Sequence, residues 1–263
     1  DGRPVLPTAA TPKTANLTRI SYGEQPILEV EYYQPEEWQD ICQLATQQGD
    51  TDHTKVACEL VQMVKLPPQD VQSLLVQGKQ QIEANNLDDL MGKLNQYAGN
   101  DGAYTALVKM IRLYLPIEEL KGFDVIDTPG MNDPVLSRTQ KTKEEMARCD
   151  VVFFLSRSGQ FLDQSDMHLL ANQLPQSGVK RMILVAGQYD ALLLDDGFNR
   201  DSLAATEDNL TQRIHKRAST EMGKLAEQRR QAGRDENADL IAQLTTPILA
   251  STFAHGFAHW PQE

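Results

Sequence analysis

Residues 123–130 read Phe-Asp-Val-Ile-Asp-Thr-Pro-Gly, an apolar run that ends in the tetrapeptide Asp127-Thr128-Pro129-Gly130. A carboxylate at a strand end, followed three residues later by a glycine, is the arrangement with which nucleotide hydrolases hold magnesium and the terminal phosphate. Glycine is needed because a side chain would block the approach of its backbone amide to the phosphate. The alternative interpretation is a simple turn, since Pro-Gly is a common turn dipeptide.

The order of apolar runs around this stretch predicts an α/β fold. Strands are predicted at 17–22 and 26–33, joined as a hairpin by the turn at residues 23–25. The remaining predicted elements are strands at 110–115, 122–126, 151–155, 181–185 and 247–250, helices near 137–148 and 165–174, and a long charged helix with an apolar face from Leu203 to Leu225. Apolar strands alternating with helices indicate a three-layer fold with a mostly parallel sheet covered on both faces. Ligands of such sheets bind at the carboxyl ends of the strands.

The stretch 35–106 differs in character from the segments on either side of it. Gln, Asp, Leu and Ala dominate it, and its apolar residues recur at helical spacing. Pro35 with two following glutamates is a good helix start, and Pro67-Pro68 interrupts the pattern. We therefore expect three or four short helices inserted between strands.

Composition narrows the classes of function. The chain has 25 Lys and Arg against 37 Asp and Glu, a formal net charge of −12, which argues against a nucleic-acid-binding surface. The same charge provides no general attraction to anionic lipid, although a local basic patch is compatible with it. Three cysteines without paired spacing fit a reducing compartment. Without a signal peptide or an apolar stretch of roughly 18 residues, the sequence predicts a cytoplasmic protein.

The segment before the first predicted strand, residues 6–15, is rich in threonine, proline and alanine. Taken alone it is typical of a disordered arm. Upstream of the Asp-Thr-Pro-Gly stretch, a threonine hydroxyl here could instead complete a magnesium shell and position the attacking water. Thr14 is the best placed, and Thr8, Thr11 and Thr18 are rivals.

Two further segments follow predicted strands. Asp190, in Gly187-Gln188-Tyr189-Asp190, could accept two hydrogen bonds from the N1 and 2-amino groups of guanine, or could be a solvated loop aspartate. Ser251, after the strand at 247–250, would lie beside the same base, or could be a loop residue or helix cap.

Three stretches taken together resemble a known family: residues 6–23 (LPTAATPKTANLTRISYG), residues 127–133 (DTPGMND) and residues 147–166 (ARCDVVFFLSRSGQFLDQSD). In this order and at these separations they resemble the GTPase domain of bacterial dynamin-like proteins. The resemblance is closer to the kind linked to vesicle-associated toxin secretion in enterobacteria than to eukaryotic dynamin. It covers residues 1–34 and about 110–258, and it identifies 35–106 as an insertion within a GTPase domain that spans 1–263.

The resemblance implies a P-loop GTPase fold, GTP binding and hydrolysis with Mg²⁺, and membrane remodelling. Implied partners are GTP or GDP, a second copy through the GTPase domain, and membrane lipid contacted through segments absent from this chain, with peripheral membrane localisation. The resemblance makes Thr14, Asp127 and Gly130 catalytic, with Thr14 and Asp127 as metal ligands. It places Thr128, Gln188, Asp190 and Ser251 at the nucleotide.

The chain departs from the family pattern in two places. The phosphate-binding loop GxxxxGK[ST] occurs nowhere in these 263 residues. Either the GTPase domain is amino-terminally incomplete here, or the loop was never present; in both cases this chain is expected to be inactive in isolation, with hydrolysis a property of the parent protein. The segment 187–190 lacks the Asn or Thr and the Lys of the family's guanine motif. Alternatives are a non-hydrolysing pseudo-GTPase that serves as a scaffold or dimerisation module, an ATP-using hydrolase of similar architecture, and a plain structural domain.

Overall fold

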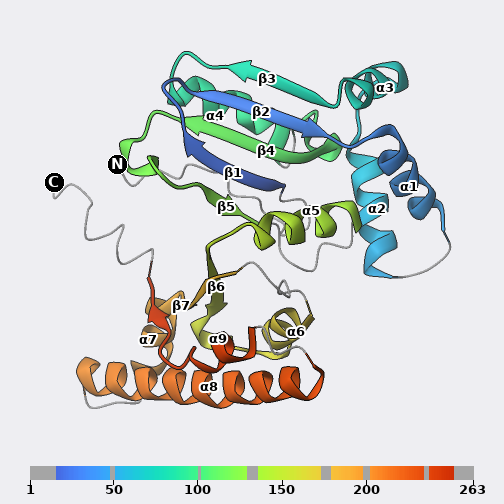
Figure 1. Ribbon diagram of the computed structural model, residues 1–263. Helices are drawn as coiled ribbons and strands as arrows, with labels where there is room; N and C mark the ends of the chain where they lie inside the picture. The colour runs from blue at the N-terminus through green and yellow to red at the C-terminus, as the bar shows by residue number, and fades with distance from the viewer. Residues whose placement is uncertain are drawn as a thin grey trace. The chain divides into compact units, whose positions relative to one another are not determined.

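The computed structural model describes residues 16–47, 51–99, 102–128, 136–172, 179–197, 202–233 and 237–251. The chain forms two compact units, residues 3–142 and residues 143–263, the latter together with residues 1–2. Each unit has a β-sheet of its own (Figure 1).

The first unit contains a five-stranded sheet of order β3-β2-β4-β1-β5. Its strands are β1 (Leu17–Tyr22), β2 (Ile27–Tyr32), β3 (Lys79–Glu83), β4 (Val108–Leu115) and β5 (Val125–Asp127). Only β1 and β4 pair in parallel, whereas the other three pairings are antiparallel. The prediction of one mostly parallel sheet is therefore wrong for this unit, whose sheet is mixed.

The predicted hairpin of β1 and β2 is also wrong, because β4 lies between these two strands (Figure 1). The turn at Gly23 crosses the end of β4, where the Gly23 amide donates to the Leu115 carbonyl at 2.9 Å. A Cβ at position 23 would lie 2.7 Å from the Cβ of Tyr114, so this crossing requires glycine. The strand between them, β4, is apolar enough to be buried in the middle of the sheet, as its many buried residues show.

Four helices lie between β2 and β4, as expected for the stretch 35–106. They are α1 (Pro35–Thr46), α2 (Asp52–Met63), α3 (Pro68–Gln77) and α4 (Leu87–Ala98), followed by the short helix η2 (Thr105–Leu107). The strand β3 within this stretch was not predicted, because Lys-Gln-Gln-Ile-Glu has little apolar character. The core of the unit joins buried residues of these helices to Leu28, Val30 and Tyr32 of β2 and to Ile111 and Leu113 of β4.

Charged side chains of β2 and β4 that lie outside this core form ion pairs with each other. Arg112 of β4 contacts Glu29 at 2.5 Å and Glu31 at 3.4 Å, both on the adjacent strand β2. Lys141 of helix α5 (Leu136–Ala147) lies 3.8 Å from Glu31. Cross-strand pairs of opposite charge favour one register of the two strands. They therefore help to hold β2 against β4 in the observed alignment.

The second unit contains a three-stranded parallel sheet of order β6-β7-β8, so the predicted parallel arrangement holds here. Its elements are β6 (Val151–Arg157), η4 (Ser158–Gln160), α6 (Gln164–Asn172), β7 (Arg181–Gly187), α7 (Tyr189–Gly197), α8 (Leu203–Gln231), α9 (Ala238–Ala242) and β8 (Ile248–Leu249). Helix η3 (Glu118–Leu120) belongs to the first unit.

One face of β6 is not buried, contrary to the prediction of a buried strand. Phe154 and Ser156 are buried, whereas Phe153 and Leu155, whose side chains alternate with them, are 58% and 68% exposed. Right-handed crossovers explain the difference. In the order β6-β7-β8 each strand lies on the same side of the one before it. Right-handed connections therefore place the helices after β6 and after β7 on one face of this sheet, and they leave the opposite face, with Phe153 and Leu155, without helices.

Helix α8 supplies the long apolar stripe that the sequence predicts. Leu210, Ile214, Ala218 and Met222 are all buried at helical spacing, whereas Leu203 at the helix start is 69% exposed. By its composition the charged run at 227–236 predicts a solvated helix end. Arg229 within this run is instead buried and donates to the Leu170 carbonyl at 2.8 Å. Within the part of the chain that the structure describes, no helix combines the length and apolar character that crossing a membrane requires.

Candidate functional site

Asp127 is the last residue of β5, at one edge of the first sheet. β5 runs antiparallel to β1, which pairs Asp127 with Thr18. Asp127 therefore does not share a carboxyl-terminal edge with a parallel neighbour, contrary to the prediction for this motif. Asp127 is exposed to solvent as a residue. The protein around its carboxyl nevertheless displaces part of the surrounding water, and this desolvation raises the pKa of Asp127 above its ordinary value.

Asp124, three residues before Asp127, is engaged differently. Its carboxylate forms an ion pair with Arg19 of β1. A hydrogen bond from the Ser21 side chain, followed by the Arg19 interaction, holds the pKa of Asp124 below its ordinary value. Asp124 therefore fastens β5 to β1, and the carboxylate of Asp127 remains the candidate for binding a ligand.

Thr128 follows β5 and is half-buried. Thr14 and Gly130 lie outside the described residues, so their predicted roles rest on the sequence. Thr18, a rival of Thr14, is buried opposite Asp127, and its hydroxyl donates to the Asn16 carbonyl at 3.1 Å. This hydrogen bond uses the hydroxyl proton and leaves the oxygen lone pairs, through which a hydroxyl binds a metal ion.

The other predicted residues lie in the second unit, where the ends of β7 and β8 are joined by hydrogen bonds. The Ala250 amide donates to the Ala186 carbonyl at 2.9 Å, and the Tyr189 amide donates to the Ala250 carbonyl at 3.1 Å. These bonds hold Ser251, directly after Ala250, close to the segment 187–190. Ser251 therefore lies near this segment at the carboxyl edge of a parallel sheet. The role of Ser251 beside a guanine base stays a prediction.

Gln188 and Asp190 are positioned by a tight change of direction after β7. Gln188 has φ of +55°, a left-handed conformation that non-glycine residues seldom adopt, and it connects the strand directly to α7. Asp190 consequently lies in the first turn of α7, not in a loop. Its side chain is half-buried, and among the described residues no group hydrogen-bonds to its carboxylate. The carboxylate is therefore available to a ligand.

Tyr189 and Ser158 support this edge, and sequence reasoning missed both. Tyr189 is buried, and its hydroxyl lies 3.1 Å from the Glu207 carbonyl and 3.1 Å from the Thr211 hydroxyl, both on α8. The Ser158 hydroxyl, directly after β6, donates to the Gly187 carbonyl at 2.8 Å. The only sequence signal for Tyr189 was an aromatic residue next to a strand end. That signal does not reveal that its hydroxyl bonds to Glu207, 18 residues away.

A buried polar contact holds the turn after β6. The Ser156 hydroxyl donates to the Asp166 carboxylate at 2.5 Å and accepts from the Leu162 amide at 2.8 Å. Burial raises the pKa of Asp166, which the hydrogen bond from Ser156 partly opposes. Among the described residues, no group of three His, Cys, Asp or Glu side chains is arranged to hold a metal ion.

Comparison with known proteins identifies the family of the chain. Residues 2–188 match the family model described as Dynamin family. "Dynamin-like protein 1" of Campylobacter jejuni subsp. jejuni serotype O:23/36 (strain 81-176) is 26% identical over 204 residues, which is 77% of this chain and 26% of that protein.

Two solved structures of an oligomerised bacterial dynamin pair are similar in fold. They are described as providing a mechanism for the long-range sensing and tethering of membranes. Their TM-scores are 0.56 and 0.51 at 21% and 20% identity, and the matches cover 95% and 90% of this chain. The chain spans only 30% and 34% of those chains. Since the family model matches well over half of its residues, the chain belongs to the Dynamin family.

Proposed function

We propose that this chain carries part of the guanine-nucleotide site of a dynamin-like GTPase, and that the full-length protein hydrolyses GTP and remodels membranes. The observation that carries the proposal is Asp127. Asp127 ends a strand, is exposed to solvent, and has a carboxyl whose pKa is raised by partial desolvation. It also begins the Asp-Thr-Pro-Gly stretch, which lies within the residues that match the Dynamin family.

The second unit supports the base-binding side of this proposal. Asp190 presents a carboxylate that no described residue occupies, in the first turn of a helix anchored by Tyr189. A carboxylate can accept both the N1 and the 2-amino protons of guanine, which adenine does not offer together. Gln188 and Ser251 would flank the base, and Thr128 would lie on the phosphate side.

Mg²⁺ fits the donor set at Asp127. Magnesium in nucleotide sites is usually held by one or two carboxylates together with the phosphates, so a single protein carboxylate is compatible with it. A bound cation would also stabilise the charged carboxylate of Asp127 and so oppose the rise in its pKa that desolvation causes. When bound, the ion would neutralise charge on the phosphates. Thr14 would be the second protein ligand.

The chain's own residues would then have separate tasks. The Asp127 carboxylate would hold a metal-bound water, and the Gly130 amide would contact the terminal phosphate. Thr14 would close over the metal, positioning the water that attacks in line. We further propose that residues 1–263 form one GTPase domain into which 35–106 are inserted. Pairing with a second copy and a peripheral position at the membrane, on its cytoplasmic side, would be properties of the full-length protein.

Fluorescent-GTP titration and phosphate release by the full-length protein test this proposal. Asp127→Ala is expected to abolish magnesium-dependent turnover and to weaken nucleotide binding. Asp208→Ala, at an exposed position on α8, serves as the matched control and should behave as wild type. Equal affinity and equal turnover in the wild type and Asp127→Ala would refute the proposal.

A non-hydrolysing scaffold is the second candidate, and Gln188 favours it. The family's guanine motif has Lys at this position, whose long stem packs on the base. Gln188 is shorter and is held in a left-handed backbone conformation. Nucleotide binding without phosphate release in the full-length protein would establish the scaffold. Competition by ATP as effective as that by GTP would instead indicate a hydrolase without guanine preference.

A further inference from the structure

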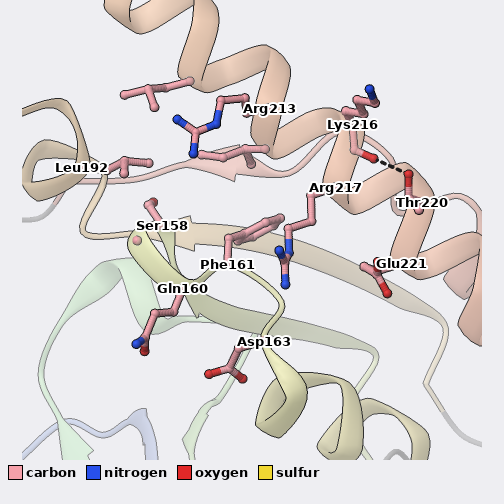
Figure 2. Close-up of a pocket in the computed structure, with 13 residues that line it drawn as sticks. Ser158, Gln160, Phe161, Asp163, Leu192, Arg213, Lys216, Arg217, Thr220 and Glu221 are labelled. Carbon is pink, nitrogen blue, oxygen red and sulfur yellow. Dashed lines mark hydrogen bonds between the residues drawn. The ribbon is translucent and has the colours of Figure 1, made fainter. Parts of the chain in front are cut away.

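The second unit contains a cavity of about 550 Å³ between helix α8 and the turn that follows β6 (Figure 2). None of the predicted nucleotide-site residues lines it. Its apolar part consists of Phe161, Leu192, Leu210 and Ile214. Phe161, Leu210 and Ile214 are themselves buried, so the cavity has a firm apolar floor.

Three cations of α8 line the same cavity, at spacing i, i+3 and i+4. They are Arg213, Lys216 and Arg217. Figure 2 shows Arg217 extending from α8 toward the turn that carries Phe161, whereas the Lys216 side chain points away from Phe161. One helix face therefore presents positive charge directly beside the apolar floor.

Most of the other charges around the cavity are compensated within the unit. Arg213 pairs with Asp196 at 3.5 Å. Glu221 pairs with Lys224 at 3.1 Å, whereas the Asp163 carboxylate keeps its charge and accepts only a neutral donor, the Asp166 amide, at 2.9 Å. Three cations and two carboxylates therefore line the cavity, which leaves an excess of positive charge.

Lys216 and Arg217 differ from these groups. Arg217 donates to the Leu162 carbonyl at 2.9 Å, a neutral acceptor. Across the residues that the structure describes, no carboxylate forms an ion pair with either side chain. In a chain with a net charge of −12, two cations without a carboxylate partner beside an apolar hollow form a local exception to the general repulsion of anions.

The shape of the cavity points to an elongated ligand. Its lining follows α8 from Leu210 to Glu221. Eleven steps of 1.5 Å correspond to about 16 Å along the helix axis. An extended peptide of about five residues has the same length.

We propose that this cavity is a docking site for a short segment of a partner protein that alternates acidic and apolar residues. The apolar side chains would occupy the hollow over Phe161 and Leu192, and the carboxylates would pair with Arg217 and Lys216. Arginine beside an apolar pocket is a frequent anchor of protein interfaces. Complementary charge sets the orientation of the segment and disfavours basic sequences.

The probe is a fluorescein-labelled peptide Glu-Leu-Glu-Phe-Glu, titrated with the complete chain and followed by anisotropy. Two comparison peptides separate the contributions of charge and apolar contact: Lys-Leu-Lys-Phe-Lys and Glu-Gly-Glu-Gly-Glu. Both are expected to bind at least about tenfold more weakly, because each lacks one of the two complementary features.

Arg217→Gln removes the charge and keeps an N–H donor for the Leu162 carbonyl. It should weaken binding of the acidic probe about threefold, and the double variant with Lys216→Gln about tenfold, as exposed ion pairs allow. Lys180→Gln removes an exposed lysine of the same unit outside the cavity and should leave binding unchanged. Leu192→Glu, at a half-buried lining position, should abolish binding by placing a like charge in the hollow.

Circular dichroism would establish that each variant is folded. Equal binding of the three peptides, or full affinity in both Arg217→Gln and Leu192→Glu, would overturn the proposal. Binding to phosphatidylserine vesicles that depends on Arg217, without binding of the acidic peptide, would also overturn it and assign the cavity to a lipid headgroup.

Discussion

Replacing Tyr189 by phenylalanine removes a single buried oxygen from the edge that carries Gln188 and Asp190. The ring is retained, so no cavity forms, and only the contacts of the hydroxyl with the Glu207 carbonyl and the Thr211 hydroxyl are lost. Each such hydrogen bond contributes about 1 kcal/mol net. The Glu207 carbonyl belongs to α8, where a backbone amide can satisfy it, so the expected loss is about 1 kcal/mol instead of the full sum.

This loss should appear locally, as easier opening of the start of α7. A change of about 1 kcal/mol corresponds to roughly a fivefold change in an opening equilibrium. Hydrogen–deuterium exchange of peptides covering residues 186–197 should therefore be about fivefold faster in Tyr189→Phe than in the wild type. Tyr114→Phe is the matched control, since no hydrogen bond of its hydroxyl is present among the described residues. Exchange within twofold of wild type in Tyr189→Phe would refute the anchoring role.

Two further predictions concern the turn of the first unit and the buried carboxyl of the second. Gly23→Ala should destabilise the first unit by about 1–3 kcal/mol in urea unfolding, because the new methyl would lie 2.7 Å from the Cβ of Tyr114. Gly92→Ala, in the open middle of α4, should stabilise by roughly 0.5–1 kcal/mol, and a loss equal to that of Gly23→Ala would contradict the steric argument. Burial raises the folded-state pKa of Asp166, so its contribution to stability is present below its unfolded pKa, near 3.9, and is lost as pH rises through the folded pKa. Asp166→Asn, which mimics the protonated form, should remove that part of the decline in unfolding free energy; identical pH profiles of variant and wild type would show that Asp166 does not cause it.

The elements that the sequence predicted well are those whose residues carry their own periodic signal. The buried stripe of α8 repeats every three to four residues from Leu210 to Leu225, and the structure buries all of it. The parallel strands β6 and β7 are short apolar runs separated by a helix, a pattern that leaves few topologies. Local pattern is sufficient in these cases because it reflects which face of the element is buried.

The failures arise where the deciding partner is distant in sequence. Gly23-Glu24-Gln25 has the composition of a hairpin turn, yet β4, about ninety residues later, occupies the space between the two strands. The charged run at 227–236 reads as a solvated helix end, yet Arg229 is buried and donates to the Leu170 carbonyl at 2.8 Å. No local window contains either partner, so neither outcome could be predicted from pattern alone.

By itself, the sequence determined the α/β class, the position of the Asp127 motif after a strand, and membership of a family recognisable from a few stretches. These depend on residue type and spacing along the chain. Tertiary structure alone decided that the first sheet is mixed, that Asp190 lies in the first turn of a helix anchored by Tyr189, and that α8 presents two cations with no carboxylate partner among the described residues beside an apolar hollow. The physical reason is that strand order, buried hydrogen bonds and charge compensation depend on residues brought together from distant parts of the chain.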